Sequence, residues 1–387
     1  MALPVSYNVR NVFVRWRSTL ATILGIALVV AVFVLVQSLA IGLRKTSANT
    51  GDPRNLMIVR KGSTAESVSQ VTREQLRYLQ YMEEIARDAQ GQPLVSADTL
   101  VLVNLPRVED KGAANVLLRG ISPRGKELRP QVSLVDGRWF ERGKREVVVS
   151  RRLGGRFQNF HIGGQFTTAG ATFTVVGWME GGKSAFDSEV WMDADEARKI
   201  FGRENYSSVL VRPVDEPAAM RLKVKLENSR QIAARVWRET EYYADQTKMA
   251  LPIQVVGNFL AVAMSIGAVF AAMNTMYASV GARTREVGTL RVLGFRRRSI
   301  LVSFLLEGAF LAFLGGCLGC AFAMPMNGYA ASVIGFETFS EMMFEFRITP
   351  ELVAQGLIFS VIVGLIGSLL PAVRASRLPV ISALKSV

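Results

Sequence analysis

One segment of the chain has the spacing of a phosphate-binding loop. Residues 177–184 read Gly-Trp-Met-Glu-Gly-Gly-Lys-Ser and fit the pattern G-x-x-x-x-G-K-S, in which backbone N–H groups and a lysine hold nucleotide phosphates. A β-prone run precedes this loop, but the chemistry also requires a helix after it, whose N-terminus meets the phosphates. Residues 185–192 predict another strand instead. We therefore interpret the segment as a glycine-rich hairpin turn and expect no cofactor at Gly177, Gly182, Lys183 and Ser184.

Two other patterns could carry chemistry. Cys317 and Cys320 have the C-x-x-C spacing of thioredoxin-like redox pairs, but Leu, Ala and Gly flank them in an apolar run. We interpret them as small residues that let membrane helices approach closely. His161 is the only histidine, and no cysteine lies near it in the sequence, so we expect no zinc site. The sequence thus predicts no catalytic residue and no metal site.

Glu307 lies about two turns inside an otherwise uncharged apolar stretch. A carboxylate at that depth is costly, so it should face a partner or water rather than lipid. One interpretation is a proton relay in an ion-coupled carrier, although such carriers usually contain several intramembrane charges. The other, which we prefer, is a membrane relay: Glu307 contacts a basic loop or the fourth helix and transmits movement of that loop.

Four apolar stretches reach the length of about 20 residues that a membrane-spanning helix needs. They cover residues 18–43, 251–280, 301–336 and 351–373. The third is too long for one straight span, and Pro325 indicates that it tilts, kinks or continues outside the bilayer. The first is far longer than the apolar core of a cleaved signal peptide, about 7–15 residues, so we expect it to remain as an anchor.

The basic residues predict the orientation of these spans. The net charge of +14 could indicate nucleic-acid binding, but most of it lies beside the apolar stretches. Three segments carry twelve basic residues and one acid, Glu286: Arg10, Arg15, Arg17, Arg283, Arg285, Arg291, Arg296, Arg297, Arg298, Arg374, Arg377 and Lys385. Because positive residues accumulate on the cytoplasmic side, we expect both termini there. We predict a multi-pass protein of the bacterial inner membrane, with no nucleic-acid partner.

The long segment 44–250 between the first two spans is polar enough to fold outside the membrane. Short β-prone runs occur at 115–118, 146–149, 172–176 and 208–211. Helical patterns occur at 72–88, 194–201 and 218–243, the last leading into the second span. The fold class is therefore an α-helical membrane protein with four spans and an α+β extracytoplasmic domain inserted between the first two.

Four shorter segments complete this organisation. Residues 281–300 form a cytoplasmic loop or helix, 337–350 a short extracytoplasmic loop, and 374–387 a cytoplasmic tail. Residues 1–17 combine aromatic and aliphatic positions with arginines. They form either an amphipathic helix on the inner leaflet or simply a basic flank of the first span.

The cytoplasmic connection between the second and third spans has a pattern of its own. Glu286, Leu290 and Leu293 fall on one helical stripe, to which Val287 adds, and Gly294 is typical of a helix stop. A short helix with an apolar stripe predicts a docking surface for another protein. Anchoring at the membrane surface is the alternative, and it would explain the arginines but not the stripe.

This connection resembles a known family. Residues 283–301 read Arg-Thr-Arg-Glu-Val-Gly-Thr-Leu-Arg-Val-Leu-Gly-Phe-Arg-Arg-Arg-Ser-Ile-Leu, and Phe-Leu-Leu-Glu-Gly follows at 304–308. Both are similar to the FtsX-like, or MacB-type, permease family, as is the closing segment 370–379, Leu-Pro-Ala-Val-Arg-Ala-Ser-Arg-Leu-Pro. Residues 137–140 and 146–150 resemble the periplasmic domain of that family.

The resemblance implies the permease subunit of an ABC transporter, which is not itself an enzyme. An ABC ATPase subunit would bind ATP and magnesium and would touch the connection through eight residues: Arg285, Glu286, Val287, Gly288, Leu290, Arg291, Leu293 and Gly294. Further partners would be membrane lipid, a second permease copy, identical or paralogous, and a periplasmic adaptor. The transporter would export or extract a lipid, lipoprotein or amphiphile by mechanotransmission, moving its extracytoplasmic domains. The alternative is an FtsX-like regulator of a cell-wall hydrolase that transports nothing, although an outer segment of about 200 residues favours export.

Overall fold

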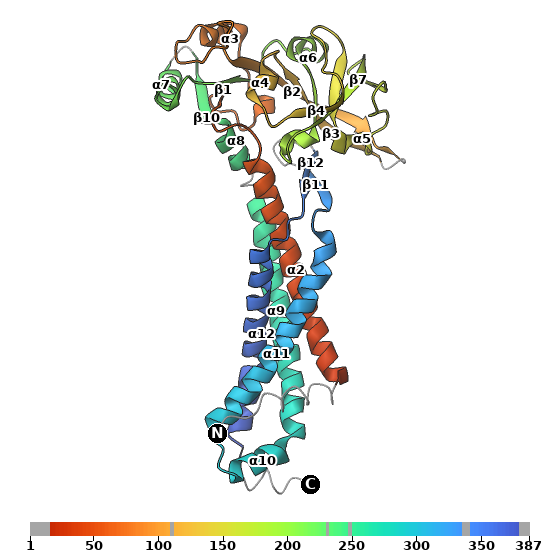
Figure 1. Cartoon of the computed structure of the whole chain (residues 1–387), viewed down its shortest axis with the longest axis vertical. Coiled ribbons are helices and arrows are strands. Elements are labelled where there is room, and N and C mark those ends of the chain that lie inside the picture. The colour runs from red at the N-terminus through yellow and green to blue at the C-terminus, as the bar shows by residue number, and fades with distance from the viewer. Residues whose placement is uncertain (1–15, 109–111, 230–231, 247–249, 335–340, 379–387) are drawn as a thin grey trace. The chain divides into compact units, whose positions relative to one another are not determined.

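The computed structural model describes residues 16–108, 112–229, 232–246, 250–334 and 341–378 (Figure 1). These residues form two compact units. The membrane unit takes its residues from 1–41, 251–329 and 346–387, and the α/β unit takes its residues from 42–250 and 330–345. Each unit is described separately, and the interpretation of residues 1–17 lies almost entirely outside the described residues.

Four described helices are long and apolar enough to cross a membrane. They are α2 (Trp16–Ala48), α9 (Ala250–Ala282), α11 (Arg297–Ala323) and α12 (Pro350–Ser376). The four predicted spans are therefore confirmed as helices. Their ends lie beyond the predicted limits in α2, α9 and α12, because apolar stretches mark only the lipid-facing part of a helix.

The third apolar stretch differs from its predicted extent of 301–336. Helix α11 ends at Ala323, and a single 3₁₀ turn with Pro325 in it, η5 (Met324–Met326), follows. The chain then enters strand β11 (Ala330–Ile334), which pairs antiparallel with β12 (Glu341–Glu345). Proline lacks the N–H that would continue the helix, so the remaining apolar residues become part of a β-hairpin. The expected short loop 337–350 is in part the second strand of this hairpin.

Small residues let α11 and α12 pack closely within the membrane unit. A Cβ atom added to Gly364 would lie 2.3 Å from the Cβ of Ala312, and one added to Gly316 would lie 2.3 Å from the Oγ of Ser360. The two cysteines are unpaired, and Cys320 is buried. The interpretation of the two cysteines as small packing residues fits Cys320, whose Sγ would lie 3.3 Å from a Cβ added to Gly356 of α12, but not Cys317, which is exposed.

The α/β unit is built on one mixed sheet. In the described part of the chain its strand order is β10-β1-β9-β2-β3-β8-β5-β7-β4, with β6 paired to β7. The pairs β3–β8 and β5–β7 are parallel and the others are antiparallel. The strands are β1 (Leu56–Arg60), β2 (Val95–Pro106), β3 (Ala113–Ile121), β4 (Ser133–Gly137), β5 (Glu146–Ser150), β6 (Gln165–Thr168), β7 (Ala171–Glu180), β8 (Glu189–Asp193), β9 (Ser208–Val211) and β10 (Ala234–Arg238).

Helices and short turns cover this sheet and complete its cores. They are η1 (Glu66–Val68), α3 (Arg73–Gln80), α4 (Gly125–Leu128), α5 (Arg151–Gly154), η3 (Ala185–Ser188), α6 (Ala194–Ile200), α7 (Glu216–Glu227) and α8 (Glu239–Gln246). Leu79 of α3 and Leu222 of α7 pack with Ile58 and Val209 in one buried apolar cluster. A second buried apolar cluster contains Val149 of β5 and Val175 of β7.

Most local predictions for this unit agree with the structure, with one clear exception. The four predicted strands lie within β3, β5, β7 and β9, and the pattern at 194–201 forms α6. The helix predicted at 72–88 is shorter, because α3 ends at Gln80. The helix predicted over 218–243 is wrong in its middle, where β10 separates α7 from α8. Residues of β10 pair with β1 along its whole length, so the sheet edge determines their conformation.

Candidate coupling site

A short helix, α10 (Thr284–Val292), joins α9 to α11 at one end of the membrane unit (Figure 1). It begins after Arg283 and ends at the cap residue Leu293. Gly294 follows with a φ of +90°, the left-handed conformation that glycine adopts without a steric penalty. The predicted helix stop therefore lies at the predicted residue.

One face of α10 is packed against the long helices. Val287 is only 3% exposed, and it lies in a cluster with Val280 of α9, Phe304 of α11 and Ala372 of α12. Gly288 beside it is also buried. Helix α10 is therefore in close-packed contact with the ends of three long helices.

The other face of α10 is open. Leu293 is 69% exposed and Val292 is 62% exposed, whereas Leu290 is half-buried. Arg285 and Glu286 are exposed on the same helix. Arg291 donates from Nη1 to the carbonyl oxygen of Phe295, 3.3 Å away. The predicted stripe is thus divided: Val287 is buried in the membrane unit, Leu290 is half-buried, and Glu286 and Leu293 are exposed.

Glu307 of α11 has a direct partner at the start of α10. Its Oε2 accepts a hydrogen bond from Nη1 of Arg283 at 2.8 Å, and its Oε1 accepts one from the hydroxyl of Ser279 at 3.3 Å. The ion pair is buried, since the Arg283 and Glu307 side chains are 7% and 6% exposed. Together, the contacts of Glu307 with Ser279 and Arg283 join the end of α9 to α11 across the beginning of α10. Removing one partner would leave the other as an unpaired buried charge.

The sequence interpretation named Glu307 but not its two partners. Arg283 could have been identified, because it is the basic residue of the connection nearest to the second span and has the opposite charge. No sequence signal indicated Ser279, whose hydroxyl is one of many in the spans. The other named residues, Arg285 to Gly294, all lie on α10 or directly after it.

The loop that matches a phosphate-binding pattern has a different structure from the one expected. Its first residues lie at the end of β7, and η3 then leads into β8. Strand β5 lies between β7 and β8, so the loop crosses over a strand and the predicted hairpin turn is wrong. Only the single turn of η3 follows Ser184, and the amide of Gly181 donates to Oδ1 of Asp187 at 2.6 Å. The loop therefore binds a side chain of the protein itself, that of Asp187.

A cluster of ionisable side chains is buried inside the α/β unit. Arg119 on β3 is 1% exposed and lies 2.8 Å from Glu189, 2.9 Å from Glu66 and 3.3 Å from Asp98. Burial raises the pKa of Glu66 above its usual range, although Arg119 opposes that shift. Because the cluster is closed to solvent and its groups are hydrogen-bonded to one another, we interpret it as a structural network rather than a substrate site.

A second arginine extends this cluster to the two chain segments by which the α/β unit follows α2 and leads into α9. Arg129 lies 2.7 Å from Asp98 and 3.0 Å from Glu239, the first residue of α8. Oε2 of Glu239 also accepts hydrogen bonds from the backbone of Asp52 at 2.9 Å and from Nδ2 of Asn55 at 2.8 Å. One carboxylate thus holds both the segment that follows α2 and the helix that precedes α9.

Among the described residues, no group of three or more histidine, cysteine or acidic side chains could hold a metal ion.

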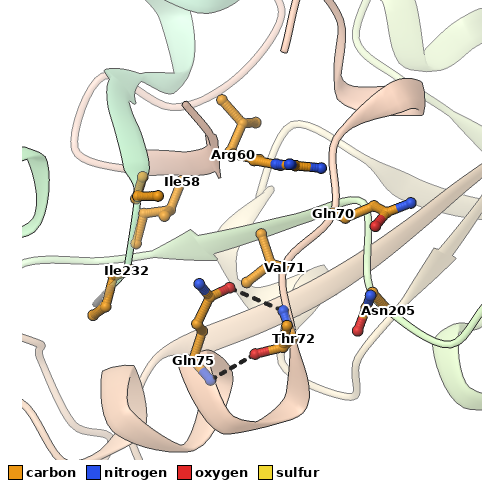
Figure 2. Close-up of a pocket in the computed structure, with 11 residues that line it drawn as sticks. Ile58, Arg60, Gln70, Val71, Thr72, Gln75, Asn205 and Ile232 are labelled. Atoms are coloured by element: carbon orange, nitrogen blue, oxygen red, sulfur yellow. Dashed lines mark hydrogen bonds between the residues drawn. The ribbon is translucent and has the colours of Figure 1, made fainter. Parts of the chain in front are cut away.

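Figure 2 shows a small open pocket on the α/β unit, of about 150 Å³. Its apolar wall includes Ile58, Val71 and Ile232. Thr72 and Gln75 at its rim bind each other as the capping box that starts α3, with N···O distances of 3.2 and 3.0 Å. Ligand pockets usually measure about 300–1,000 Å³, so we do not take this one as the functional site.

Two family descriptions match the chain. Residues 19–228 match the MacB-like periplasmic core domain, and residues 258–380 match the FtsX-like permease C-terminal region. Together they include α2, most of the α/β unit, α9, α10, α11 and α12.

Curated relatives are similar over much of the chain at low identity. The macrolide export ATP-binding/permease protein MacB of Hahella chejuensis is 24% identical over 316 residues, which are 76% of this chain and 47% of that protein. The uncharacterized ABC transporter permease YknZ of Bacillus subtilis is 26% identical over 221 residues, 53% of this chain and 51% of that protein. The matched region is therefore about half the length of each of these relatives.

Solved structures of related outer domains also match at low similarity. The periplasmic region of MacB from Actinobacillus actinomycetemcomitans has a TM-score of 0.39 and 15% identity, covering 53% of this chain and 94% of that one. The extracellular domain of the transporter YknZ has a TM-score of 0.35 and 17% identity, covering 47% of this chain and 99% of that one.

Proposed function

Because the chain belongs to the FtsX-like permease family with a MacB-like periplasmic core domain, we propose that it is an ABC transporter permease driven by a separate ATPase subunit. The observation that carries this proposal is that α10 is buried on one side and exposed on the other. One side of that helix is buried among the ends of α9, α11 and α12, and its end presents Val292 and Leu293 to solvent. Exposed apolar residues next to basic ones are suited to a groove on another protein.

In the proposed mechanism, the ATPase subunit binds α10 and moves it during ATP binding and hydrolysis. The exposed coupling residues, Arg285, Glu286, Leu293 and Gly294, provide the contact surface together with the half-buried Leu290 and Arg291. Val287 and Gly288, also expected at this surface from the sequence, are buried in the membrane unit and cannot touch the ATPase. Movement would pass to the spans through Val287 and through the Arg283–Glu307 pair, which joins the start of α10 to α11. Glu307 is thereby a positioning residue in the coupling pathway rather than a proton relay.

The remaining parts of the proposal concern partners and substrate. ATP and magnesium would bind to the partner ATPase, and two permease copies would assemble with it in the inner membrane. The α/β unit would work outside the cytoplasm, together with an adaptor protein. A substrate handled there would be a lipid, lipoprotein or amphiphile, since the four spans are strongly apolar and offer little lining for a polar solute.

Affinity purification of a tagged chain from its own host tests the ATPase partnership. We expect mass spectrometry to find an ABC ATPase with the unchanged chain and to lose it with Leu293→Asp, because a carboxylate would enter an apolar contact. Val68→Asp is the matched control, since Val68 is 59% exposed but lies on the α/β unit. Recovery of the ATPase with Leu293→Asp, or ATP hydrolysis by the permease chain alone, would contradict the proposal.

The same purification separates export from regulation. A transporter should purify with an adaptor or an exit-duct protein, whereas a regulator of the FtsX type should purify with a cell-wall hydrolase. The second result would keep the role of α10 and remove the substrate from the proposal.

A further inference from the structure

The β11–β12 hairpin connects two membrane helices in the sequence, yet it packs as part of the α/β unit. Met343 on β12 is 5% exposed and lies in the buried cluster of Val149 and Val175. Its backbone N–H donates to the hydroxyl of Ser188 at 2.7 Å. Because the Met343 side chain is buried in this cluster, the hairpin is an integral part of the α/β unit.

Charged groups fix the end of the same strand. Oε1 of Glu345 accepts a hydrogen bond from Arg152 at 2.6 Å, and its Oε2 lies 3.3 Å from Nζ of Lys183. Burial alone would raise the pKa of Glu345, but Arg152 and Lys183 outweigh burial and lower it. On the first strand, Ser332 accepts a hydrogen bond from Arg156 at 3.1 Å.

The loop that matches a phosphate-binding pattern takes part in this contact through Lys183. Lys183 has a φ of +61°, unusual for a residue with a side chain, and this conformation is held where the loop turns towards η3. Gly181 has no room for a side chain, because a Cβ there would lie 2.8 Å from the backbone nitrogen of Asp187. The lysine of this loop therefore pairs with Glu345 of the hairpin, while the backbone N–H of Gly181 is bonded to Asp187.

A glycine in α2 allows the end of that helix to lie close to the hairpin. A Cβ atom on Gly42 would lie 2.1 Å from the carbonyl oxygen of Glu345. Helix α2 contains one other glycine, Gly25, at which a Cβ would meet nothing within 4 Å. Gly42 is thus required for the close approach of β12, and Gly25 is a matched position without such a contact.

We propose that the β11–β12 hairpin is a third mechanical connection between the membrane helices and the α/β unit, in addition to α2 and the α8–α9 connection. The hairpin is joined covalently to α11, which directly follows α10, so movement of α10 can reach the α/β unit without passing through α9. Glu345, Arg152, Lys183 and Gly42 are its positioning residues. This inference rests on the proposed function for its driving movement, but the attachment of the hairpin is independent of that function.

Thiol labelling tests the attachment in the full chain in membranes. Met343→Cys should react slowly with a membrane-impermeant maleimide, because position 343 is buried in the α/β unit. Adding Gly42→Ala should raise the labelling rate at least about tenfold, which corresponds to about 1.4 kcal/mol of lost contact energy. Gly25→Ala should change the rate by less than about twofold, and Glu345→Gln should raise it by an intermediate factor. Equal rates in the Gly42 and Gly25 variants would overturn the attachment.

A second measurement tests the mechanical role in the complex with its ATPase. Spin labels at Thr289 on α10 and Val224 on α7 report whether ATP changes their separation. We expect an ATP-dependent change in the parent and in Gly25→Ala, and its loss in Gly42→Ala with ATP turnover retained. A parent that shows no change contradicts the proposed function. A Gly42→Ala variant that moves like the parent contradicts the third connection alone.

Discussion

At the scale of single residues, Arg129 shows how strongly the α/β unit depends on paired charges. Its side chain is completely buried between Asp98 and Glu239. Arg129→Met would leave both carboxylates without this cation, and breaking a buried pair costs about 3–5 kcal/mol of unfolding free energy. We expect the melting temperature of the purified chain to fall by about 2–4 °C for each kcal/mol lost. Arg54→Met is the control, because the Arg54 side chain is 65% exposed and its pair with Asp52 should contribute less than about 1 kcal/mol.

Glu66 in the same cluster predicts a pH dependence. Burial raises its folded pKa above the usual 4.5, so the neutral form is the one that the fold favours. Its contribution to stability is fully present below that usual value and is lost as the pH rises through the raised folded value. We expect Glu66→Gln, which stays neutral, to lose less stability than the parent as the pH rises above the usual value of about 4.5. Melting curves over a series of pH values measure this, and parallel losses in parent and variant would show that Glu66 is charged throughout.

Glu307 predicts a defect in coupling rather than in folding. Glu307→Gln keeps a hydrogen-bond acceptor for Arg283 but removes the charge that pairs with it. We expect the assembled complex to retain ATP turnover and to lose most of the ATP-dependent change in the separation of labels at Thr289 and Val224. Glu351→Gln is the control, because Glu351 is exposed in the first turn of α12. An unchanged label response in Glu307→Gln would remove Glu307 from the coupling pathway.

At the scale of elements, the packing of α11 against α12 can be tested through one glycine. A side chain at Gly364 would meet Ala312 at 2.3 Å and the backbone oxygen of Gly308 at 2.8 Å. Gly364→Val should therefore separate the two helices and lower stability by about 1–3 kcal/mol, the usual cost of overpacking. Gly25→Val makes the same change in helix propensity where the space is open. Equal melting temperatures for the two variants in detergent would show that α11 and α12 are free to move apart.

The elements differ in how far the sequence could predict them. The four spans were predicted because uninterrupted apolar runs reflect a lipid environment, which requires only composition. The strand β10 was missed because its conformation depends on pairing with β1, which lies more than 170 positions earlier in the sequence. The β11–β12 hairpin was missed for a related reason, since its apolar residues are buried by the α/β unit rather than by lipid.

The local structure of the candidate site could be predicted more fully than the fold around it. Its residues are local, and the stop at Gly294 follows from one residue type. Two features depended on tertiary structure: the division of the apolar stripe into a buried Val287 and an exposed Leu293, and the pairing of Glu307 with Arg283. The interpretation of the glycine-rich loop 177–184 needed only the residues that follow it, but its contact with Glu345 depends on the sheet order.

At the scale of the whole molecule, the distribution of charge predicts on which side of the membrane each part works. The twelve basic residues near the spans belong to the termini and to the connection that contains α10, so these should face the cytoplasm. The coupling proposal requires this orientation, because ATP is available on that side. The α/β unit must then lie on the opposite side, since one span separates it from each of these segments.

Labelling of single cysteines in intact cells tests this orientation directly. Val68 on the α/β unit and Thr289 on α10 are both exposed, so Val68→Cys and Thr289→Cys should both be reactive once a reagent reaches them. With the outer permeability barrier opened, we expect an impermeant maleimide to label Val68→Cys and to leave Thr289→Cys unlabelled until the inner membrane is broken. Labelling of Thr289→Cys in intact cells would place α10 beyond the reach of any cytoplasmic ATPase. No arrangement of Arg283, Glu307 and the hairpin could then couple the chain to ATP.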